Sequence, residues 1–430
     1  MSLICKKNPQ TGESLYYKRH ESGLKIYIMP RKDYSSSYAI FGTKYGSIDS
    51  EFIVPGENAP TKVPDGIAHY LEHKMFDMPD NSNVFDSFSR FGGNANAFTS
   101  FDMTAYLFSA TSNFEENLKI LMDYVQKPYF TEESVKKEQG IIGQEIRMYD
   151  DNANWRVFFN FLDCLYQNHP VKKDIAGTVE SIAEINSELL YKCYNTFYNL
   201  SNMTIFVTGD FEPEKILSVI EKNIIKNEPF NEEIKRIYPK EPKEVAAKYK
   251  EINLCVAMPK FVMGFKDNNV GFGGIELQKK AIATEILLKM LFSKSSPLYE
   301  KLYNDGLITP DFATEYSPQI DYAYTAVEGE SKNPQKVYDT IIEYIDQLHK
   351  TGLSQDDFER AKKVVWGNYV CSYNDIEGFA HSFLTNSFMG IDYFDFYNAY
   401  KAVSFDDVKK RFAEHFDKEY SVLSVVKPIA

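Results

Sequence analysis

Apolar and polar residues alternate along this chain with two different periods. Strand-like alternation, in which about every second residue is apolar, occurs at residues 24–29, 38–45 and 96–108. Helical spacing predicts helices that begin near Gly66, at Phe114, at Glu132 and near Ala153, the first with Asp65 at the N-cap position. Strands and helices are mixed throughout, so the pattern indicates a fold that contains both α-helices and β-sheet.

The order of the predicted elements in the first half of the chain recurs in the second half. A strand ending at Phe108, a helix, and a helix opening at residues 131–133 are echoed by a strand at 322–326, a helix, and a helix opening at 354–357. A period of about half the chain indicates a duplicated α/β unit, because solenoid repeats are only roughly 20 to 50 residues long. A charged, proline-containing stretch separates the copies, and we divide the chain into domains 1–235 and 236–430.

Length, composition and charge narrow the class of protein. A chain of 430 residues is long enough for two to four domains of roughly 100 to 200 residues. Its 43% hydrophobic and 25% charged residues are typical of soluble globular proteins, and no stretch reaches the roughly 18 apolar residues of a membrane helix. The net charge of −13 disfavours nucleic acids and anionic membranes, because both carry negative charge. We therefore expect no nucleic-acid partner and no membrane insertion.

The N-terminal residues and the cysteines favour the cytoplasm. Residues 1–9 lack the apolar segment and the small-residue cleavage site of a secretory signal. The five cysteines are widely spaced and include no C-x-x-C pair, which argues against a disulfide framework and against a cysteine zinc site. We predict a cytoplasmic protein whose cysteines pack as reduced thiols.

One five-residue segment, HYLEH at residues 69–73, carries candidate metal chemistry. His69 and His73 share a helix face, so both imidazoles can bind one ion, and Glu72 lies beside them. Two nitrogen ligands suit Zn²⁺, and a third protein ligand would leave one position for water, as in catalytic zinc sites. Glu72 can take a proton from that water and deliver it to a leaving amine. The alternative is a buried histidine pair that only hydrogen-bonds with Glu72.

Four segments together resemble a known family. They are residues 65–73, 96–99, 104–106 and 138–146. Over nearly its whole length the chain is similar to the inverted-zincin peptidases, which include pitrilysin, insulin-degrading enzyme and mitochondrial processing peptidase, and in particular to short bacterial members called YmfH-like. The resemblance implies an α+β fold of two similar halves, each a mostly antiparallel sheet covered by helices, facing one another across a cavity. It also implies a zinc metalloendopeptidase that hydrolyses peptides.

The resemblance also supplies the other residues of the metal site. In this family a glutamate on a later helix is the third zinc ligand and another glutamate lies two turns earlier; Glu145 and Glu138 match these places. Residues seven apart share a helix face, which agrees with this assignment. We expect one Zn²⁺ ion on His69, His73 and Glu145, with Glu138 orienting a ligand histidine. Without the family match, two solvated surface glutamates are the alternative.

Small residues precede the strand-like stretch at 96–108. Such a composition lets another backbone approach closely, although a Gly-Gly pair before a strand, here at 92–93, is more often only a turn. The resemblance implies that a peptide pairs with this edge beside the zinc, with Asn96, Ala97 and Phe98 at the matching positions. Main-chain pairing tolerates many sequences, so the natural substrate and the cleavage specificity are not readable.

The second half lacks the residues that complete the active site in single-chain relatives. No histidine occurs between His169 and His349, so this half carries no second zinc motif. In those relatives the half supplies an arginine and a tyrosine that stabilise the oxyanion. Here residues 295–309 contain no arginine, and Thr309 stands about where the tyrosine is expected. Losing one such donor costs roughly 10²- to 10³-fold in rate.

We therefore predict that the chain is the zinc-carrying subunit of a heterodimer whose homologous partner supplies the arginine and tyrosine. In a homomer, Tyr303 or Tyr316 is the alternative source of the hydroxyl. A second hypothesis is a non-catalytic assembly or peptide-capturing subunit that retains the peptidase fold, and a hydrolase of small amides is a third. The sequence does not give the identity of a partner, or the activity and metal content of the isolated chain.

Overall fold

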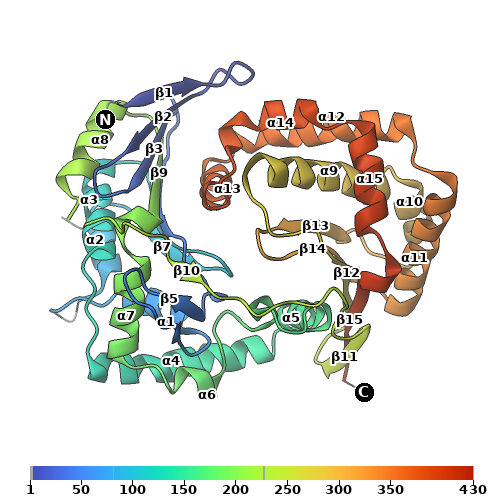
Figure 1. The fold of residues 1–430 in the computed structure, drawn as a ribbon, viewed down its shortest axis with the longest axis horizontal. Coiled ribbons are helices and arrows are strands. Elements are labelled where there is room, and N and C mark those ends of the chain that lie inside the picture. Colours follow the sequence, from blue (N-terminus) through green and yellow to red (C-terminus); the bar gives the residue numbers. More distant parts are fainter. Residues whose placement is uncertain (1–2, 81, 226–227, 430) are drawn as a thin grey trace. The chain divides into compact units, whose positions relative to one another are not determined.

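The computed structural model describes residues 3–80, 82–225 and 228–429. It divides into two compact units (Figure 1), of which the first contains Met1–Ile146, Asp174–Tyr238 and Ser372–Phe388. The second contains Arg147–Lys173, Pro239–Cys371 and Met389–Ala430. Each unit therefore includes a segment that lies in the other half of the sequence. The predicted linear division at residue 235 does not include these two exchanges.

The first unit is built on a seven-stranded sheet with the order β1-β2-β3-β9-β4-β8-β7. Neighbouring strands are antiparallel except β3 and β9, which are parallel. The strands are β1 (Ile4–Lys7), β2 (Ser14–Arg19), β3 (Lys25–Pro30), β4 (Ser37–Thr43), β7 (Asn94–Thr99), β8 (Thr104–Ala110) and β9 (Met203–Gly209). A small separate sheet has the order β10-β5-β6 and consists of β5 (Glu51–Ile53), β6 (Thr61–Lys62) and β10 (Lys235–Arg236).

Helices cover both faces of the large sheet. Helices α3 and α8 pack against strands β8 and β3, whereas α13 packs against β4 and β9. The helices of this unit are α1 (Ile67–Lys74), α2 (Val84–Arg90), α3 (Phe114–Val125), most of α4 (Glu132–Asp150), α6 (Val179–Ile182), α7 (Ser187–Phe197), α8 (Pro213–Lys222) and α13 (Ile376–Phe388).

The second unit has a five-stranded sheet with the order β11-β15-β12-β14-β13. Its strands are β11 (Tyr249–Leu254), β12 (Lys260–Lys266), β13 (Ala313–Pro318), β14 (Ala323–Glu330) and β15 (Ser421–Pro428). Its helices are α5 (Ala153–Leu165), α9 (Gly274–Phe292), α10 (Pro297–Asn304), α11 (Pro334–Thr351), nearly all of α12 (Gln355–Ser372), α14 (Phe396–Ala402) and α15 (Phe405–His415). Of the helices in the described part of the chain, none combines the length and apolar character needed to span a bilayer.

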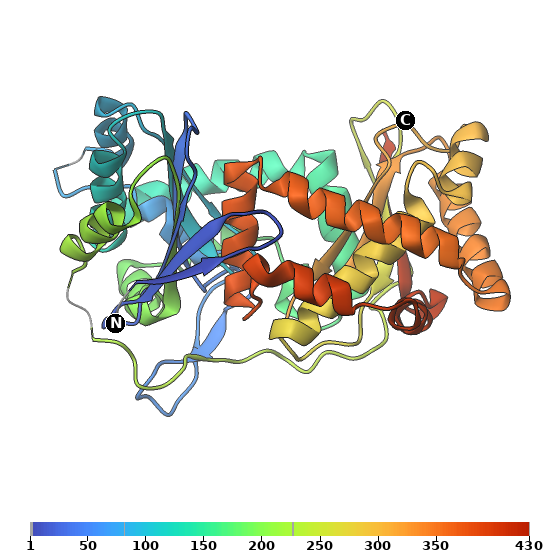
Figure 2. The ribbon, with the colours of Figure 1, turned by 90° about the horizontal axis from the view of Figure 1, so that it is seen from above.

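The two sheets share one topology, which confirms the fold of two similar halves. Strands β3-β9-β4-β8-β7 correspond in order to β11-β15-β12-β14-β13, and the first pair is parallel in both sheets while the others are antiparallel. The helices that follow β8 and β14 correspond as well, as the repeat predicted. The helix after these, α5 in the first copy of the repeat and α13 in the second, packs on the sheet whose strands come from the other copy: α5 on β12 and β15, and α13 on β4 and β9. Both exchanged helices can be followed by colour in Figures 1 and 2.

Most predicted elements are confirmed, with three corrections. The helices predicted to begin at Phe114, Glu132 and Ala153 do begin at these residues. The stretch at 96–108 is two strands, because Ser100 and Met103 close a turn in which the Ser100 N–H donates to the Met103 carbonyl (2.8 Å). Gly66, not Asp65, is the N-cap of α1. Of the cysteines, Cys164 and Cys193 are buried, whereas the other three are exposed and do not pack in a core.

A buried charge network lies in the second unit between β12, α9 and α15. The carboxylate of Asp267 accepts hydrogen bonds from both terminal nitrogens of Arg411 (2.5 and 3.2 Å) and from the Tyr316 hydroxyl (2.7 Å), and Lys280 Nζ lies 3.3 Å away. Burial alone would raise the pKa of Asp267, but the neighbouring His415, Arg411 and Lys280 together outweigh it and hold the pKa well below its usual range. The ionised carboxylate therefore compensates two buried cations.

We predict that Asp267→Asn lowers the free energy of unfolding by about 3 to 5 kcal/mol, because it leaves Arg411 and Lys280 buried without their counter-charge. Both tryptophans of the chain, Trp155 and Trp366, lie in the second unit, so their fluorescence in urea reports its unfolding. The folded-state pKa is depressed, so the stabilisation is complete above the unfolded-state pKa and is lost as pH falls below it. The difference between wild type and variant should therefore shrink below about pH 4.

The matched control is Asp305→Asn, which removes the half-exposed partner of Lys301 on α10 and should leave the urea midpoint unchanged. Equal stability of Asp267→Asn and wild type at pH 7 would contradict the assignment of a compensating role.

Candidate metal and catalytic site

Helix α1 begins where two backbone segments meet closely. Gly66 has a φ of 89°, and a Cβ atom there would lie 2.3 Å from the Ala176 carbonyl oxygen. The Ser181 hydroxyl donates to the Asp65 carbonyl (2.8 Å), on the same side of the junction. Only glycine combines this backbone conformation with this approach at low cost. The first turn of α1 is therefore fixed against the loop that precedes α6.

The buried side of α1 determines where its polar side points. Tyr70 and Leu71 are completely buried, and the Tyr70 hydroxyl donates to the Val135 carbonyl of α4. This hydrogen bond holds α1 beside α4. His69 and Glu72 are also buried at this junction, although both are polar.

The structure brings together the three residues predicted to bind metal. His69 Nε2 lies 3.7 Å from Glu145 Oε1, and His73 Nε2 lies 3.4 Å from Glu145 Oε2. The potential ligand atoms of the three side chains all lie within 4.8 Å of one another. Ligand atoms about 2.0 to 2.1 Å from a tetrahedral ion are separated by about 3.3 Å. The cluster thus has the donor types and spacing of a zinc site with three protein ligands.

Glu138 contacts the opposite nitrogen of His73. Its Oε1 lies 3.1 Å from His73 Nδ1. A neutral imidazole that donates from Nδ1 to this carboxylate presents the lone pair of Nε2 toward Glu145, which is the orientation a metal requires. Burial raises the pKa of Glu138, but the hydrogen bond with His73 and the charges of His73, Lys74 and Lys137 together outweigh this effect, and the net shift of the pKa is downward. Glu138 therefore lies two helical turns before Glu145 on α4, in contact with His73.

His69 differs from His73 in its surroundings. Its Nδ1 is buried and has no hydrogen-bond partner among the described residues. Burial, followed by the charge of His73, lowers the pKa of His69 to about 4, so this ring is neutral at pH 7 and able to act as a ligand. For His73, burial lowers the pKa, but the hydrogen bond to Glu138 and the charges of Glu72 and Glu145 outweigh it and the pKa is raised.

Glu72 lies beside the histidines and is held by a residue that sequence reasoning missed. The Thr99 hydroxyl on β7 donates to Glu72 Oε2 (3.0 Å). Burial raises the pKa of Glu72 to about 7, which suits a group that takes and returns a proton near neutral pH. The sequence did contain a signal for the orientation of Thr99, because the two-residue period of a strand places Thr99 and Phe98 on opposite faces.

The three predicted substrate-binding residues all lie on β7. This strand is the last in the order of its sheet, so one of its edges has no neighbouring strand in the sheet. Asn96 is exposed, and Ala97 and Phe98 are half-buried. The edge therefore has the exposure needed for strand addition.

The two tyrosines considered as substitutes for an oxyanion donor lie in different environments. The Tyr316 hydroxyl is committed to Asp267 in the buried network described above. Tyr303 is half-exposed on α10, where its ring stacks beside Tyr299. Thr309 is placed with its hydroxyl buried and without a hydrogen-bond partner among the described residues. Of these, only Tyr303 has a side chain exposed to a second molecule.

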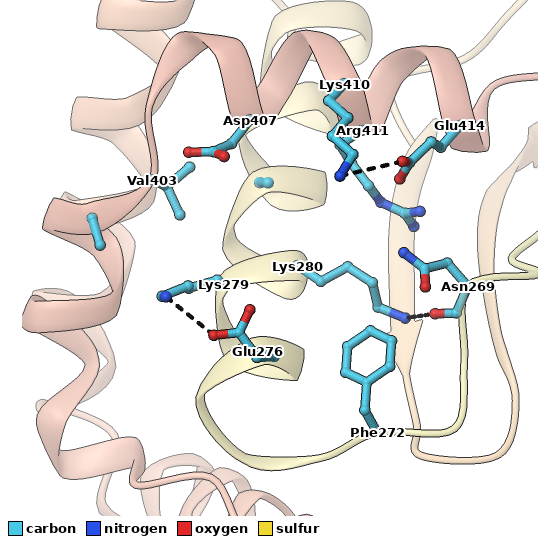
Figure 3. Close-up of a pocket in the computed structure, with 12 residues that line it drawn as sticks. Asn269, Phe272, Glu276, Lys279, Lys280, Val403, Asp407, Lys410, Arg411 and Glu414 are labelled. Carbon is cyan, nitrogen blue, oxygen red and sulfur yellow. Dashed lines mark hydrogen bonds and ion pairs between the residues drawn. The ribbon is translucent and has the colours of Figure 1, made fainter.

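A cavity of about 550 Å³ lies in the second unit and contains none of the metal-site residues (Figure 3). Its charged side chains are paired: Lys279 with Glu276 (3.2 Å), and Lys410 with Glu414 (3.8 Å). Lys280 Nζ donates to the Asn269 carbonyl (2.5 Å). Among the described residues, the one group of side chains close enough together to hold a metal ion is His69, His73 and Glu145, which lies outside this cavity.

Two family models match the chain. The one described as insulinase (peptidase family M16) matches residues 53–179, which include the cluster. The one described as peptidase M16 inactive domain matches residues 184–365.

Relatives and solved structures match nearly the whole chain. A Bacillus subtilis (strain 168) protein named uncharacterized zinc protease YmfH is 42% identical and covers 97% of this chain and 98% of its own length. A crystal structure described as an M16-like peptidase from Alicyclobacillus acidocaldarius has a TM-score of 0.93 at 34% identity, covering 99% of this chain and all (100%) of that one. Pitrilysin has a TM-score of 0.76 at 14% identity, and this chain covers 47% of it, a similarity of fold alone. Identity to YmfH over almost all of both chains, with the two family models, shows that this chain belongs to peptidase family M16, a family of zinc proteases.

Proposed function

We propose that this chain is a zinc metalloendopeptidase and the zinc-carrying subunit of a heterodimer. The observation that carries the proposal is the convergence of His69, His73 and Glu145 on one point, with the buried carboxyl of Glu72 beside them. His69, His73 and Glu145 would hold one Zn²⁺, which supplies a Lewis acid that polarises a peptide carbonyl and acidifies water. A cytoplasmic location stays a prediction.

The residues of the chain perform the remaining steps. Glu72 accepts a proton from the attacking water and delivers it to the leaving amine, and a pKa near neutrality favours both transfers. Thr99 holds the Glu72 carboxylate through one oxygen and leaves the other free for this proton. Glu138 keeps His73 in the tautomer that presents Nε2. The edge of β7 pairs with the peptide backbone through Asn96, Ala97 and Phe98.

The heterodimer is supported by what residues 295–309 contain. They include no arginine, and Tyr316 is engaged by Asp267. Oxyanion stabilisation is a large term in peptide hydrolysis, so a complete site needs donors from elsewhere. A homologous subunit that carries an arginine and a tyrosine would supply them.

We predict that Glu72→Gln lowers zinc-dependent cleavage of an unstructured peptide by at least about 100-fold, because it removes the proton acceptor. Zinc content should stay at one ion per chain, since Glu72 is not a ligand. Cleavage is followed with a quenched fluorescent peptide and zinc by elemental analysis. The control, Glu133→Gln, changes an exposed carboxylate on α4 and should leave both quantities unchanged. Equal cleavage by Glu72→Gln and wild type would refute the assigned role.

A second prediction separates a ligand from a residue that orients one. Glu138→Gln should weaken zinc affinity by about 10- to 100-fold, because it loosens His73, and Glu145→Gln should weaken it further. Affinity is measured by competition with a chromogenic chelator, again with Glu133→Gln as the control. Unchanged affinity in Glu145→Gln would remove this residue from the ligand set.

The heterodimer gives a third prediction. The isolated chain should cleave slowly, and adding a homologous subunit with the arginine and tyrosine should raise the rate by about 10²- to 10³-fold. The rate increase should disappear when Glu72→Gln replaces the wild-type chain. Peptide binding without cleavage in the reconstituted complex would instead favour the alternative of a non-catalytic, peptide-capturing subunit.

A further inference from the structure

Helix α13 brings one histidine to the predicted substrate edge within the first unit. The ring of His381 stacks on the ring of Phe98, with centroids 4.9 Å apart and an interplanar angle of 18°. His381 lies 283 positions beyond Phe98 along the chain. Both side chains are half-buried, so the pair keeps a part of its surface accessible.

A hydrogen bond from the sheet holds the imidazole of His381 in place. Its Nε2 lies 2.7 Å from the hydroxyl of Tyr38, a completely buried residue on β4. Two residues further along α13, Phe383 packs against Phe206 of β9, with ring centroids 4.7 Å apart. Burial lowers the pKa of His381, so the ring is uncharged near neutral pH. The pair is thus a fixed, uncharged aromatic surface.

This surface lies on the opposite face of β7 from the metal cluster. Successive side chains of a strand point to opposite faces, so Phe98 and Thr99 point away from each other. Thr99 contacts Glu72, whereas Phe98 contacts His381. A peptide strand added to the edge of β7 would alternate in the same way, and side chains directly across an antiparallel pair lie about 4.5 to 5.5 Å apart. Every second peptide side chain therefore points to the Phe98 face, and the one paired with Phe98 lies against this aromatic pair.

We propose that Phe98 and His381 form a specificity surface that selects peptides with a large apolar or aromatic side chain at one position. The proposal rests on the proposed function, because it assumes that a peptide adds to β7. Aromatic contacts, stacked or edge-on, and the burial of apolar surface favour a large apolar or aromatic peptide side chain. The uncharged ring of His381 can pack against such a side chain. His381 contacts the bound side chain and also positions Phe98.

The test measures binding without turnover. Glu72→Gln is titrated with a set of labelled, unstructured peptides in which one phenylalanine is moved through an alanine–serine background, and binding is read by fluorescence anisotropy. We expect phenylalanine at one position to tighten binding by about three- to tenfold over the all-alanine–serine peptide. Adding His381→Ala should abolish this gain. His381→Phe, which retains a ring on Phe98, should keep the gain.

The matched control is Ser382→Ala, the neighbouring residue on the same helix, which should keep the full preference. A gain that persists in His381→Ala, or that is lost equally in His381→Phe, would overturn the proposal. Failure of the proposed function gives a different result: the wild-type chain mixed with its partner subunit then cleaves no peptide. If wild type cleaves in a zinc-dependent manner but no variant alters the preference, only the specificity surface is refuted.

Discussion

The contact between helices α1 and α4 is the constraint on which the site depends. Tyr70 is buried on the inner side of α1 and donates to a backbone carbonyl of α4, which fixes both the rotation and the height of α1. Residues on a helix are spaced by about 100°, so a rotation by one position would turn the two histidines away from Glu145. The apolar packing of α1 thus sets the positions of its polar residues, and the potential ligands His69, His73 and Glu145 lie together because α1 and α4 pack in this way.

Both sheets need helices from elsewhere in the chain, because their central strands are buried on both faces. Strand β9 is buried at every position, and β4 at every position but its first, so neither shows the alternation of a sheet with one face in water. Such strands require cover on both faces. In the first unit α13 provides the second cover, and in the second unit α5 does so. The exchange is symmetric, since each copy of the repeat supplies one helix to the sheet whose strands come from the other copy.

Strand β7 has a double role because its side chains point both ways. One face holds Glu72 through Thr99, and the other face carries Phe98 against His381. Its free edge lies between these two faces. A peptide paired to that edge would therefore be read on one face and approach the catalytic carboxyl on the other, which joins recognition to chemistry through a single rigid element.

The elements that could be predicted from the amino-acid sequence are those whose signals are local. The helix starts, the HYLEH motif and the seven-residue spacing of Glu138 and Glu145 are short-range patterns, and the duplication was readable because both copies keep the same order of elements. Only the tertiary structure decided which distant residues meet. Thr99 reaches Glu72, and His381 reaches Phe98, through the packing of separate elements. The physical reason is that a helix period fixes neighbours within one turn or two, whereas contacts between elements depend on how buried apolar faces pack, and no local pattern specifies that.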